Sequence, residues 1–416
     1  MDPAIILTII LVIISADFLF EQGMEWLNMS AQKDEIPNEM KDFYNEEKYK
    51  KSQEYHRVQT RFSFITSTFS FILSFLLLYF GFFGWLDTQV GNNFEGNILN
   101  ALVFFGVLFI ASDVINTPFS VYSTFVIEEK FGFNKTTVKT FIADKLKGYL
   151  LALIIGGALG WIFLYLVFNL GESFWIYFLG VIGVFMLFIN MFYTTLILPL
   201  FNKLTPLEDG ELKQAIQDYC NKENFPLSNI FVIDGSKRSN KSNAFFSGIG
   251  KKKKVVLYDT LIENHSKEEL VAIFAHEVGH FKKKHIIQGY IISIIQVAIT
   301  LLILSLMIFN EDLSKALGGT RMAVQLNLLA FGILYSPISR ITGLLMMLLS
   351  RKNEYQADAF ATKTYNGSAL QTALKKLSVD NLSNLYPHKA YVFFHYSHPP
   401  LLNRLEAIEG EITEKG

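Results

Sequence analysis

Two histidines and a glutamate are the residues of this chain whose spacing most directly indicates chemistry. His276 and His280 are four positions apart, so on a helix their imidazoles lie one turn apart and can share one metal ion. Glu277 lies on the neighbouring face, where its carboxylate can polarise a water in the open fourth position of zinc. The spacing predicts metal-assisted peptide hydrolysis. The alternative is two ordinary histidines on a structural helix.

A helix over these residues is predicted independently. Ser266 and Glu269 have the spacing of a capping box, in which a serine begins a helix and a glutamate three residues later bonds back to it. Apolar residues then recur at helical spacing and would bury the back of the helix: Leu270, Ile273, Phe274 and Val278.

A zinc hydrolase needs a third protein ligand. His285 is five positions after His280, which would turn it off the shared face of a continuous helix. Glu354 and Asp358 are a better pair, because they lie one turn apart on a second predicted helix. We expect Glu354 to coordinate and Asp358 to bond the outer nitrogen of a ligand histidine. The alternative is a charged helix beside the membrane that keeps contact with water.

The C-terminal part contains a further histidine and arginine. Pro399 and Pro400 restrict the backbone beside His398, and Arg404 would fall on the helix that follows. Near a metal-bound carbonyl, His398 and Arg404 could stabilise the oxyanion that forms when water attacks. Without a metal site, the same residues would be an ordinary helix start.

A possible substrate strand precedes the paired histidines. Residues 230–233 and 255–258 have the composition of short strands, and Asn243–Phe246 between them is also strand-like. Such a strand could be the edge against which an extended peptide pairs. It could equally be one more strand of a small sheet.

The composition indicates a membrane protein. The chain has 416 residues, of which 51% are hydrophobic, and several apolar runs reach membrane-spanning length. A net charge of −1 gives no case for nucleic-acid binding, and a single cysteine excludes both an intrachain disulfide and a thiolate zinc site. We predict about seven spans, at residues 4–20, 62–86, 98–116, 149–168, 174–200, 286–308 and 323–349.

The spans suggest two domains and an orientation. We predict an N-terminal membrane domain at residues 1–200, with about five spans, and a zinc metalloprotease domain at residues 201–416 that includes the last two. Lysines and arginines gather before the second span, before the fourth (from Lys130 to Lys147) and after the fifth (Lys251–Lys254), whereas residues 87–95 and 169–173 contain none. The positive-inside rule therefore places the N-terminus outside and the C-terminus in the cytoplasm, although Lys315 and Arg321 fall in a loop assigned outside.

Two acidic residues lie inside predicted spans. Asp17 and Asp113 would be costly in lipid. They are expected either to line an aqueous cavity or to pair with another helix.

Taken together, these motifs resemble the type I CAAX prenyl proteases, which are integral-membrane zinc endopeptidases of the gluzincin clan. The segment Pro118–Asn134 carries the resemblance in the N-terminal half. Residues 243–246, 256–260, 276–280, 354–358 and 398–400 follow in the order found in that family.

The resemblance implies a mainly α fold, in which seven membrane helices enclose a water-filled chamber and a small α/β zinc domain closes its cytoplasmic end. It implies one Zn²⁺ per chain, bound by His276, His280 and Glu354, with Glu277 as the base. Transition-state stabilisation would come from Asn243, His398 and Arg404. The strand Asn243, Ala244, Phe245 and Phe246 would pair with substrate.

The family removes the last three residues from proteins that end in an isoprenylated Cys-aliphatic-aliphatic-X sequence. Phe245 and Ser247 stand where many relatives have tyrosines, which could alter substrate contacts. Frequent Lys, Asn and Ile favour a bacterial inner membrane, where prenylated substrates can be absent; a eukaryotic chain would reside in the endoplasmic reticulum. The alternatives are a quality-control zinc protease with little sequence preference and a transporter or scaffold with an incidental zinc motif.

Overall fold

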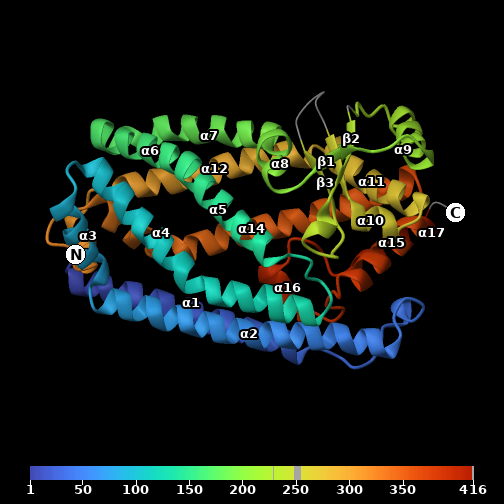
Figure 1. The fold of residues 1–416 in the computed structure, drawn as a ribbon, viewed down its shortest axis with the longest axis horizontal. Coiled ribbons are helices and arrows are strands. Elements are labelled where there is room, and N and C mark those ends of the chain that lie inside the picture. Colours follow the sequence, from blue (N-terminus) through green and yellow to red (C-terminus); the bar gives the residue numbers. More distant parts are fainter. Residues whose placement is uncertain (228, 248–253, 415–416) are drawn as a thin grey trace.

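The computed structural model describes residues 1–227, 229–247 and 254–414. Long helices run back and forth along the molecule, and the two termini lie at opposite ends of it (Figure 1). The long apolar helices are α1 (Pro3–Ser30), α2 (Glu46–Tyr79), α4 (Asn97–Tyr122), α5 (Val138–Leu151), α6 (Gly157–Leu170), α7 (Phe174–Phe192), α12 (His285–Met307) and α14 (Val324–Thr364).

These helices confirm a polytopic membrane protein. Among the described residues, six helical stretches are long and apolar enough to cross a membrane. One of them, Val138–Phe201, contains both the fourth and the fifth predicted span. The chain reverses within it at Gly171, which has a φ of 55°, and α6 then packs against α7. Six of the seven predicted spans therefore fall, to within one residue at each end, in long apolar helices, and the second does so only up to Tyr79.

Shorter elements connect and cover the long helices. The short α-helices are α3 (Phe82–Asn93), α8 (Leu198–Phe201), α9 (Glu211–Lys222), α10 (Asp259–Asn264), α11 (Lys267–Lys282), α13 (Glu311–Ala316), α15 (Gly367–Asp380), α16 (Lys389–His395) and α17 (Leu401–Thr413). Tight 3-10 turns lie at Asn38–Met40, Gly171–Ser173 and Gly235–Lys237, and π-helical turns at Ser123–Glu128, Ala152–Gly156 and Tyr193–Ile197.

The second predicted span differs from the structure at both ends. Helix α2 begins at Glu46 and stops at Tyr79, well before the predicted end at residue 86, and α3 occupies most of the predicted loop 87–95. The reason is a close approach of two backbones. A Cβ on Gly84 would lie 2.0 Å from the carbonyl of Gly318, so the chain turns at Gly81 with a φ of 68° and packs α3 beside the turn that follows α13. Apolar composition alone does not reveal this break.

The charges inside the membrane part lie on helices and are paired. Helix α5 begins at Val138, so Lys145 belongs to a helix and not to the predicted basic loop. Its Nζ lies 2.7 Å from Asp113 on α4. In the same way, Asp17 on α1 lies 3.2 Å from Arg340 on α14. Both acidic residues therefore have a partner on another helix. Residues 251–253 of the predicted basic run lie outside the described residues.

A small sheet lies at the end of the molecule that also carries α9, α10 and α11 (Figure 1). Its described strands are β1 (Leu204–Pro206), β2 (Asn229–Ile233), β3 (Ala244–Ser247) and β4 (Lys254–Tyr258), in the order β1-β2-β4-β3. The strands expected at 230–233 and 255–258 are confirmed as β2 and β4, which pair in parallel. Strand β3 pairs antiparallel with β4 and forms an edge of the sheet, so it is both a sheet strand and a free edge.

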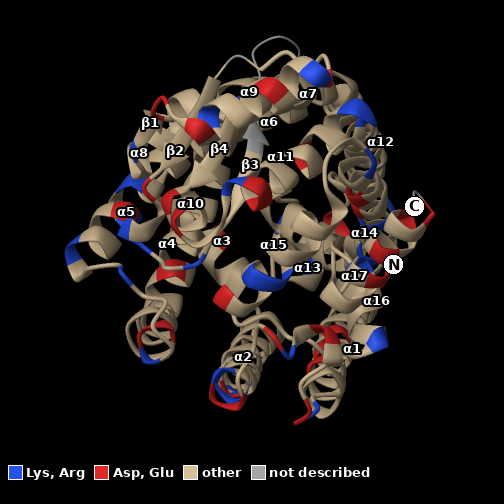
Figure 2. Ribbon diagram, turned by 90° about the vertical axis from the view of Figure 1, so that its right-hand side faces the viewer, with Lys and Arg blue, Asp and Glu red and all other residues tan. Residues whose placement is uncertain are grey.

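The largest cluster of buried apolar side chains in the described part of the chain lies beside this sheet. Side chains from α9, α11, α15 and the strands pack together there, and ten of the sixteen residues of α11 are buried. In contrast, only 6–17% of the residues in the apolar windows of the membrane helices are buried. Seen from the sheet end, residues of both charges surround the molecule, including those on α2, α5 and α10 (Figure 2).

Candidate active site

The helix that carries the paired histidines begins at the predicted capping box. The Glu269 backbone N–H donates to Ser266 Oγ over 3.3 Å, and the Ser266 backbone N–H donates to Glu269 Oε2 over 3.0 Å. The apolar residues predicted for the back of α11 are all buried in the core beside the sheet. Capping and burial therefore fix the rotation of α11, and with it the direction of His276 and His280.

The second helix of the site is continuous with a membrane span. Helix α14 runs without interruption from Val324 to Thr364, so the predicted last span leads directly into the segment that carries Glu354. It packs against α11 at Gly279, where a Cβ would lie 3.0 Å from Ala357 Cα and 3.1 Å from its carbonyl oxygen. A glycine at this position lets the two helices approach closely enough for their side chains to meet.

Three side chains converge between these helices. The Nε2 atoms of His276 and His280 are 3.1 Å apart, and the carboxylate oxygens of Glu354 lie 3.5 Å from the first and 3.2 Å from the second. Ligands at zinc–nitrogen distances on a tetrahedron are about 3.4 Å from one another. Glu354 Oε2 is buried and has no hydrogen-bond partner in the described part of the chain. A cation would satisfy that oxygen, so these residues fit a metal ion.

His276 is held by a buried ion pair. His276 Nδ1 lies 2.8 Å from Asp358 Oδ1, which is the contact predicted from the sequence. Arg404 donates from Nε and Nη2 to the same carboxylate over 2.8 and 2.6 Å. Its Nη1 lies 3.6 Å from Glu354. The Arg404 guanidinium is thus bound mainly to the carboxylates of Asp358 and Glu354. That Arg404 stabilises the oxyanion of the transition state stays a prediction.

His280 has a different support, which the sequence did not reveal. His280 Nδ1 lies 3.0 Å from His285 Nδ1, and His285 Nε2 lies 3.0 Å from Gln356 Oε1. Helix α11 does not continue through His285: it ends at Lys282, and Lys284 then adopts a φ of 60°. His285 therefore lies behind His280 and not at the shared centre.

Glu277 lies beside this group and is half-buried. Burial raises the pKa of its carboxyl above the usual value. A carboxylate with a raised pKa is suited to take up a proton near neutral pH. Its position and environment agree with the expectation that Glu277 is a general base.

His398 approaches from the C-terminal segment. Its Nε2 lies 3.5 Å from Glu354 Oε1, and its side chain is largely exposed. Arg351, one turn before Glu354 on α14, donates to the carbonyl oxygens of Val392, Phe393 and Tyr396 at the end of α16. These bonds fix the segment that leads to His398, so one helix positions both groups.

The predicted substrate strand also lies next to α11. Asn243 is exposed and immediately precedes β3, and its carbonyl oxygen accepts a bond from the Tyr258 backbone N–H over 3.1 Å. Ala244 and Phe245 lie opposite Leu257 and Val256 in the sheet, and β3 contacts α11. The backbone of Phe246 lies opposite Val255, and Ser247 opposite Lys254 completes the pairing. The structure thus places the edge strand beside the helix of the paired histidines.

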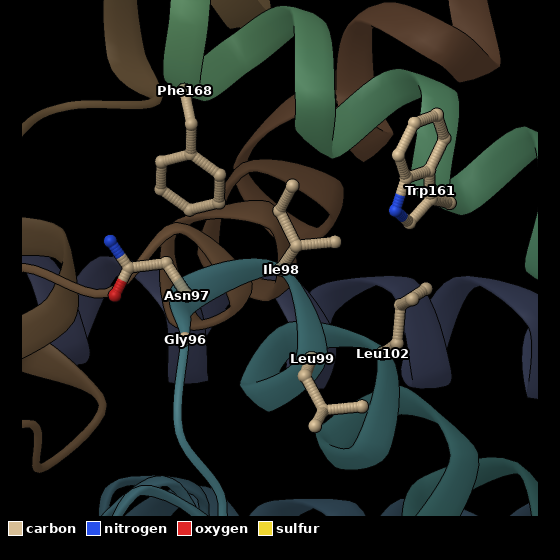
Figure 3. A pocket seen from close by; sticks show the side chains of 7 residues that line it. All are labelled: Gly96, Asn97, Ile98, Leu99, Leu102, Trp161 and Phe168. Atoms are coloured by element: carbon tan, nitrogen blue, oxygen red, sulfur yellow. The ribbon is translucent and has the colours of Figure 1, made fainter.

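A separate pocket lies in the membrane part (Figure 3). It has a volume of about 450 Å³ and lies between the start of α4 and α6. Ile98, Leu99, Leu102, Trp161 and Phe168 line most of it. Its lining is almost entirely apolar, in contrast to the charged groups that meet between α11 and α14.

Comparisons with known proteins identify the family of this chain. A family model described as CAAX prenyl protease N-terminal, five membrane helices, matches residues 25–203, and the model of Peptidase family M48 matches residues 206–412. The CAAX prenyl protease 1 homolog of Arabidopsis thaliana is 35% identical over 403 residues, which cover 95% of each chain. CAAX prenyl protease 1 of Saccharomyces cerevisiae is also 35% identical, over 96% of this chain and 94% of the yeast protein.

A solved structure is similar over nearly the whole length. The crystal structure of S. mikatae Ste24p superposes with a TM-score of 0.92 and 32% sequence identity, covering 97% of this chain and 99% of that one. The chain belongs to the CAAX prenyl protease family of M48 peptidases. It is an integral-membrane metalloendopeptidase.

Proposed function

We propose that this family member is a zinc endopeptidase that removes the last three residues from proteins or peptides ending in an isoprenylated Cys-aliphatic-aliphatic-X sequence. One Zn²⁺ per chain would be held by His276, His280 and Glu354. The observation that carries the proposal is the convergence of these three ligand groups, from α11 and α14, in a chain that matches CAAX prenyl proteases over almost its whole length.

The residues divide the chemistry among them. Zinc, when bound, supplies a Lewis acid that polarises a carbonyl and makes water a better nucleophile. Glu277 accepts the proton of the attacking water and passes it to the nitrogen of the leaving peptide. Asp358 holds His276 through Nδ1, which leaves Nε2 free to bind the metal.

Substrate would lie along the free edge of β3. An exposed strand edge offers unpaired backbone groups, and an extended peptide can add to it as a further strand. Asn243 at the start of that strand and His398 beside Glu354 would then stabilise the negative charge that develops on the scissile carbonyl. The positive charge of Arg404, which contacts Asp358 and Glu354, would further stabilise that negative charge.

The membrane part would enclose a water-filled chamber. The solvent-exposed area of the protein is 21301 Å², whereas a compact monomer of this mass exposes about 16,000 Å². Three exposed polar residues also recur at four-residue spacing on α4, within a membrane span: Ser112, Asn116 and Ser120. Such a stripe is costly against lipid, which supports water on one side of the helix.

The positive-inside rule places the sheet end, and therefore the active site, on the cytoplasmic side. The membrane would be the bacterial inner membrane or, for a eukaryotic chain, the endoplasmic reticulum.

The test is cleavage by the purified protein in detergent. We expect release of a tripeptide from a farnesylated CAAX peptide, loss of that activity with a chelator, and its return with zinc. Glu277→Gln should lower kcat by about 10³-fold while zinc stays bound, and Glu268→Gln, an exposed residue of the same helix, should not. A Glu277→Gln protein that cleaves at the wild-type rate would refute its role.

The same assay separates the alternative functions. A protease for quality control would cleave an unfolded membrane protein at least as fast as the farnesylated peptide. A transporter or scaffold would bind no zinc.

A further inference from the structure

We propose that His285 and Gln356 are positioning residues that hold His280 in the orientation needed to bind the metal. This inference rests on the proposed zinc site and deepens it. The Nδ1 atom of His276 contacts the carboxylate of Asp358. The Nδ1 atom of His280 instead contacts the imidazole of His285, which in turn contacts the side-chain amide of Gln356. The three side chains form a relay of hydrogen bonds that runs from α11 through α12 to α14.

The positions of the protons in this relay follow from the geometry. His280 Nε2 is the nitrogen that faces His276 and Glu354, so Nδ1 is the outer one. A neutral imidazole that binds metal through Nε2 carries its proton on Nδ1. His280 Nδ1–H therefore donates to His285 Nδ1 over 3.0 Å. His285 must then carry its proton on Nε2, which donates to the Gln356 amide oxygen over 3.0 Å.

The backbone is shaped to place His285 in this relay. Two bonds close the end of α11: the Lys283 N–H donates to the Gly279 carbonyl, and the Lys284 N–H donates to the Phe281 carbonyl. Lys284 then takes a left-handed conformation, with a φ of 60°, and α12 begins at His285. A lysine rarely adopts this conformation, so the local strain has to be offset by the packing around it. The turn directs His285 back towards His280.

The relay ends on the helix that also supplies the third ligand. Gln356 lies two residues beyond Glu354 on α14. Any rotation of α14 would therefore move the ligand carboxylate and the support of His280 together. His285 itself is only 7% exposed, so water cannot easily replace it. We infer that the relay keeps His280 oriented, as the ion pair of Asp358 and Arg404 keeps His276 oriented.

The experiment measures zinc affinity directly, by competition with a chelator on the full-length protein in detergent. Replacing His285 by Ala should weaken zinc binding about 10–100-fold. Gln356→Leu keeps the size of the side chain but removes the acceptor, and we expect a weakening of roughly the lower end of that range. Gln356→Glu keeps an oxygen that can accept from His285, and His285→Asn supplies an amide oxygen in place of the ring nitrogen that accepts from His280. Both variants should bind zinc nearly as tightly as the wild type.

His265→Ala is the matched control. His265 is also 7% exposed and lies in the same domain, but its ring faces the backbone carbonyls of Leu261 and Ala373 and not the site. It should lower thermal stability without weakening zinc binding. Each variant is first shown to be folded by its melting transition.

Two results would overturn the inference: a His285→Ala protein that binds zinc as tightly as His265→Ala, or a Gln356→Leu protein indistinguishable from wild type. The zinc-binding assay contains no peptide. Its result therefore does not depend on whether the protein cleaves the proposed CAAX substrate. A wild-type protein that binds no zinc would overturn the metal site, and this inference with it.

Discussion

Helices α11 and α2 show how differently the two parts of this protein are packed. Ten of the sixteen residues of α11 are buried, whereas only 6% of the apolar window of α2 is buried. Both helices are rich in apolar residues. The side chains of α11 are covered by other protein side chains, whereas most of the surface of α2 is left for lipid or interior water to cover. The largest cluster of buried side chains lies in the protease part, beside the proposed metal ligands.

The largest expected effect is loss of the metal when its carboxylate ligand is removed. Glu354→Ala should weaken zinc binding by at least about 10³-fold and abolish cleavage, because two histidines alone form an incomplete site. Metal analysis and the chelator competition assay measure this. Glu269→Ala is the control, since Glu269 is also buried on the protease side but caps α11. It should lower the melting temperature and retain zinc. Equal zinc affinity in both variants would contradict the assignment of Glu354.

The next effect concerns the ion pair behind His276. The Asp358 and Arg404 side chains are only 2% and 11% exposed, so Asp358→Ala leaves a buried guanidinium without its main partner. We expect a loss of about 3–5 kcal/mol in the free energy of unfolding, together with weaker zinc binding. The double variant Asp358→Ala/Arg404→Met should recover part of the stability but not the zinc affinity. A double variant no more stable than Asp358→Ala would show that the unpaired charge is not the cause.

A smaller effect is expected at the contact between α11 and α14. Gly279→Ala forces a methyl group to within 3.0–3.1 Å of Ala357, and should cost about 1–3 kcal/mol and reduce zinc affinity. Gly289→Ala on α12 is the matched control, because its Cβ would meet no described atom within 4 Å. That variant should be neutral or slightly more stable in a thermal melt. If Gly279→Ala is as stable as the control, α11 and α14 can move apart without loss of stability, which would contradict the importance of this close contact.

The smallest effect is expected for an ion pair of the membrane part. Lys145 and Asp113 lie 2.7 Å apart, as close as the buried pair, but their side chains are 24% and 28% exposed. If water reaches them from a chamber, Lys145→Met with Asp113→Asn should change stability by less than about 1 kcal/mol. A loss as large as that of Asp358→Ala would contradict a hydrated interior and place the pair in a dry environment.

The protease part and the membrane part also differ in how much of their structure the sequence predicts. In the protease part, the capping box at Ser266 and the apolar periodicity of α11 correctly predict the helix and the side that carries His276 and His280. The contact of Asp358 with His276 also follows from spacing, because one turn of α14 separates Asp358 from Glu354. Each of these predictions is correct because it depends on residues that lie within one or two helical turns of each other in the sequence.

Contacts that depend on a break in a helix were not predictable. The apolar run at residues 62–86 contains no signal strong enough to show that the chain turns at Gly81, since the cause is Gly318 far along the sequence. The support of His280 was missed for the same kind of reason. Lys284 is not a residue type that predicts a left-handed turn, so the sequence correctly places His285 away from the shared centre but does not predict its contact with His280. A cluster of three histidines within ten residues was the available signal.

The most direct test of this account is the location of the metal in crystals of the purified protein. Anomalous diffraction at the zinc edge should give one strong peak per chain, within about 2.0–2.2 Å of His276 Nε2, His280 Nε2 and a Glu354 carboxylate oxygen. A peak that lies elsewhere, or the absence of any peak from protein that cleaves peptides, would contradict it.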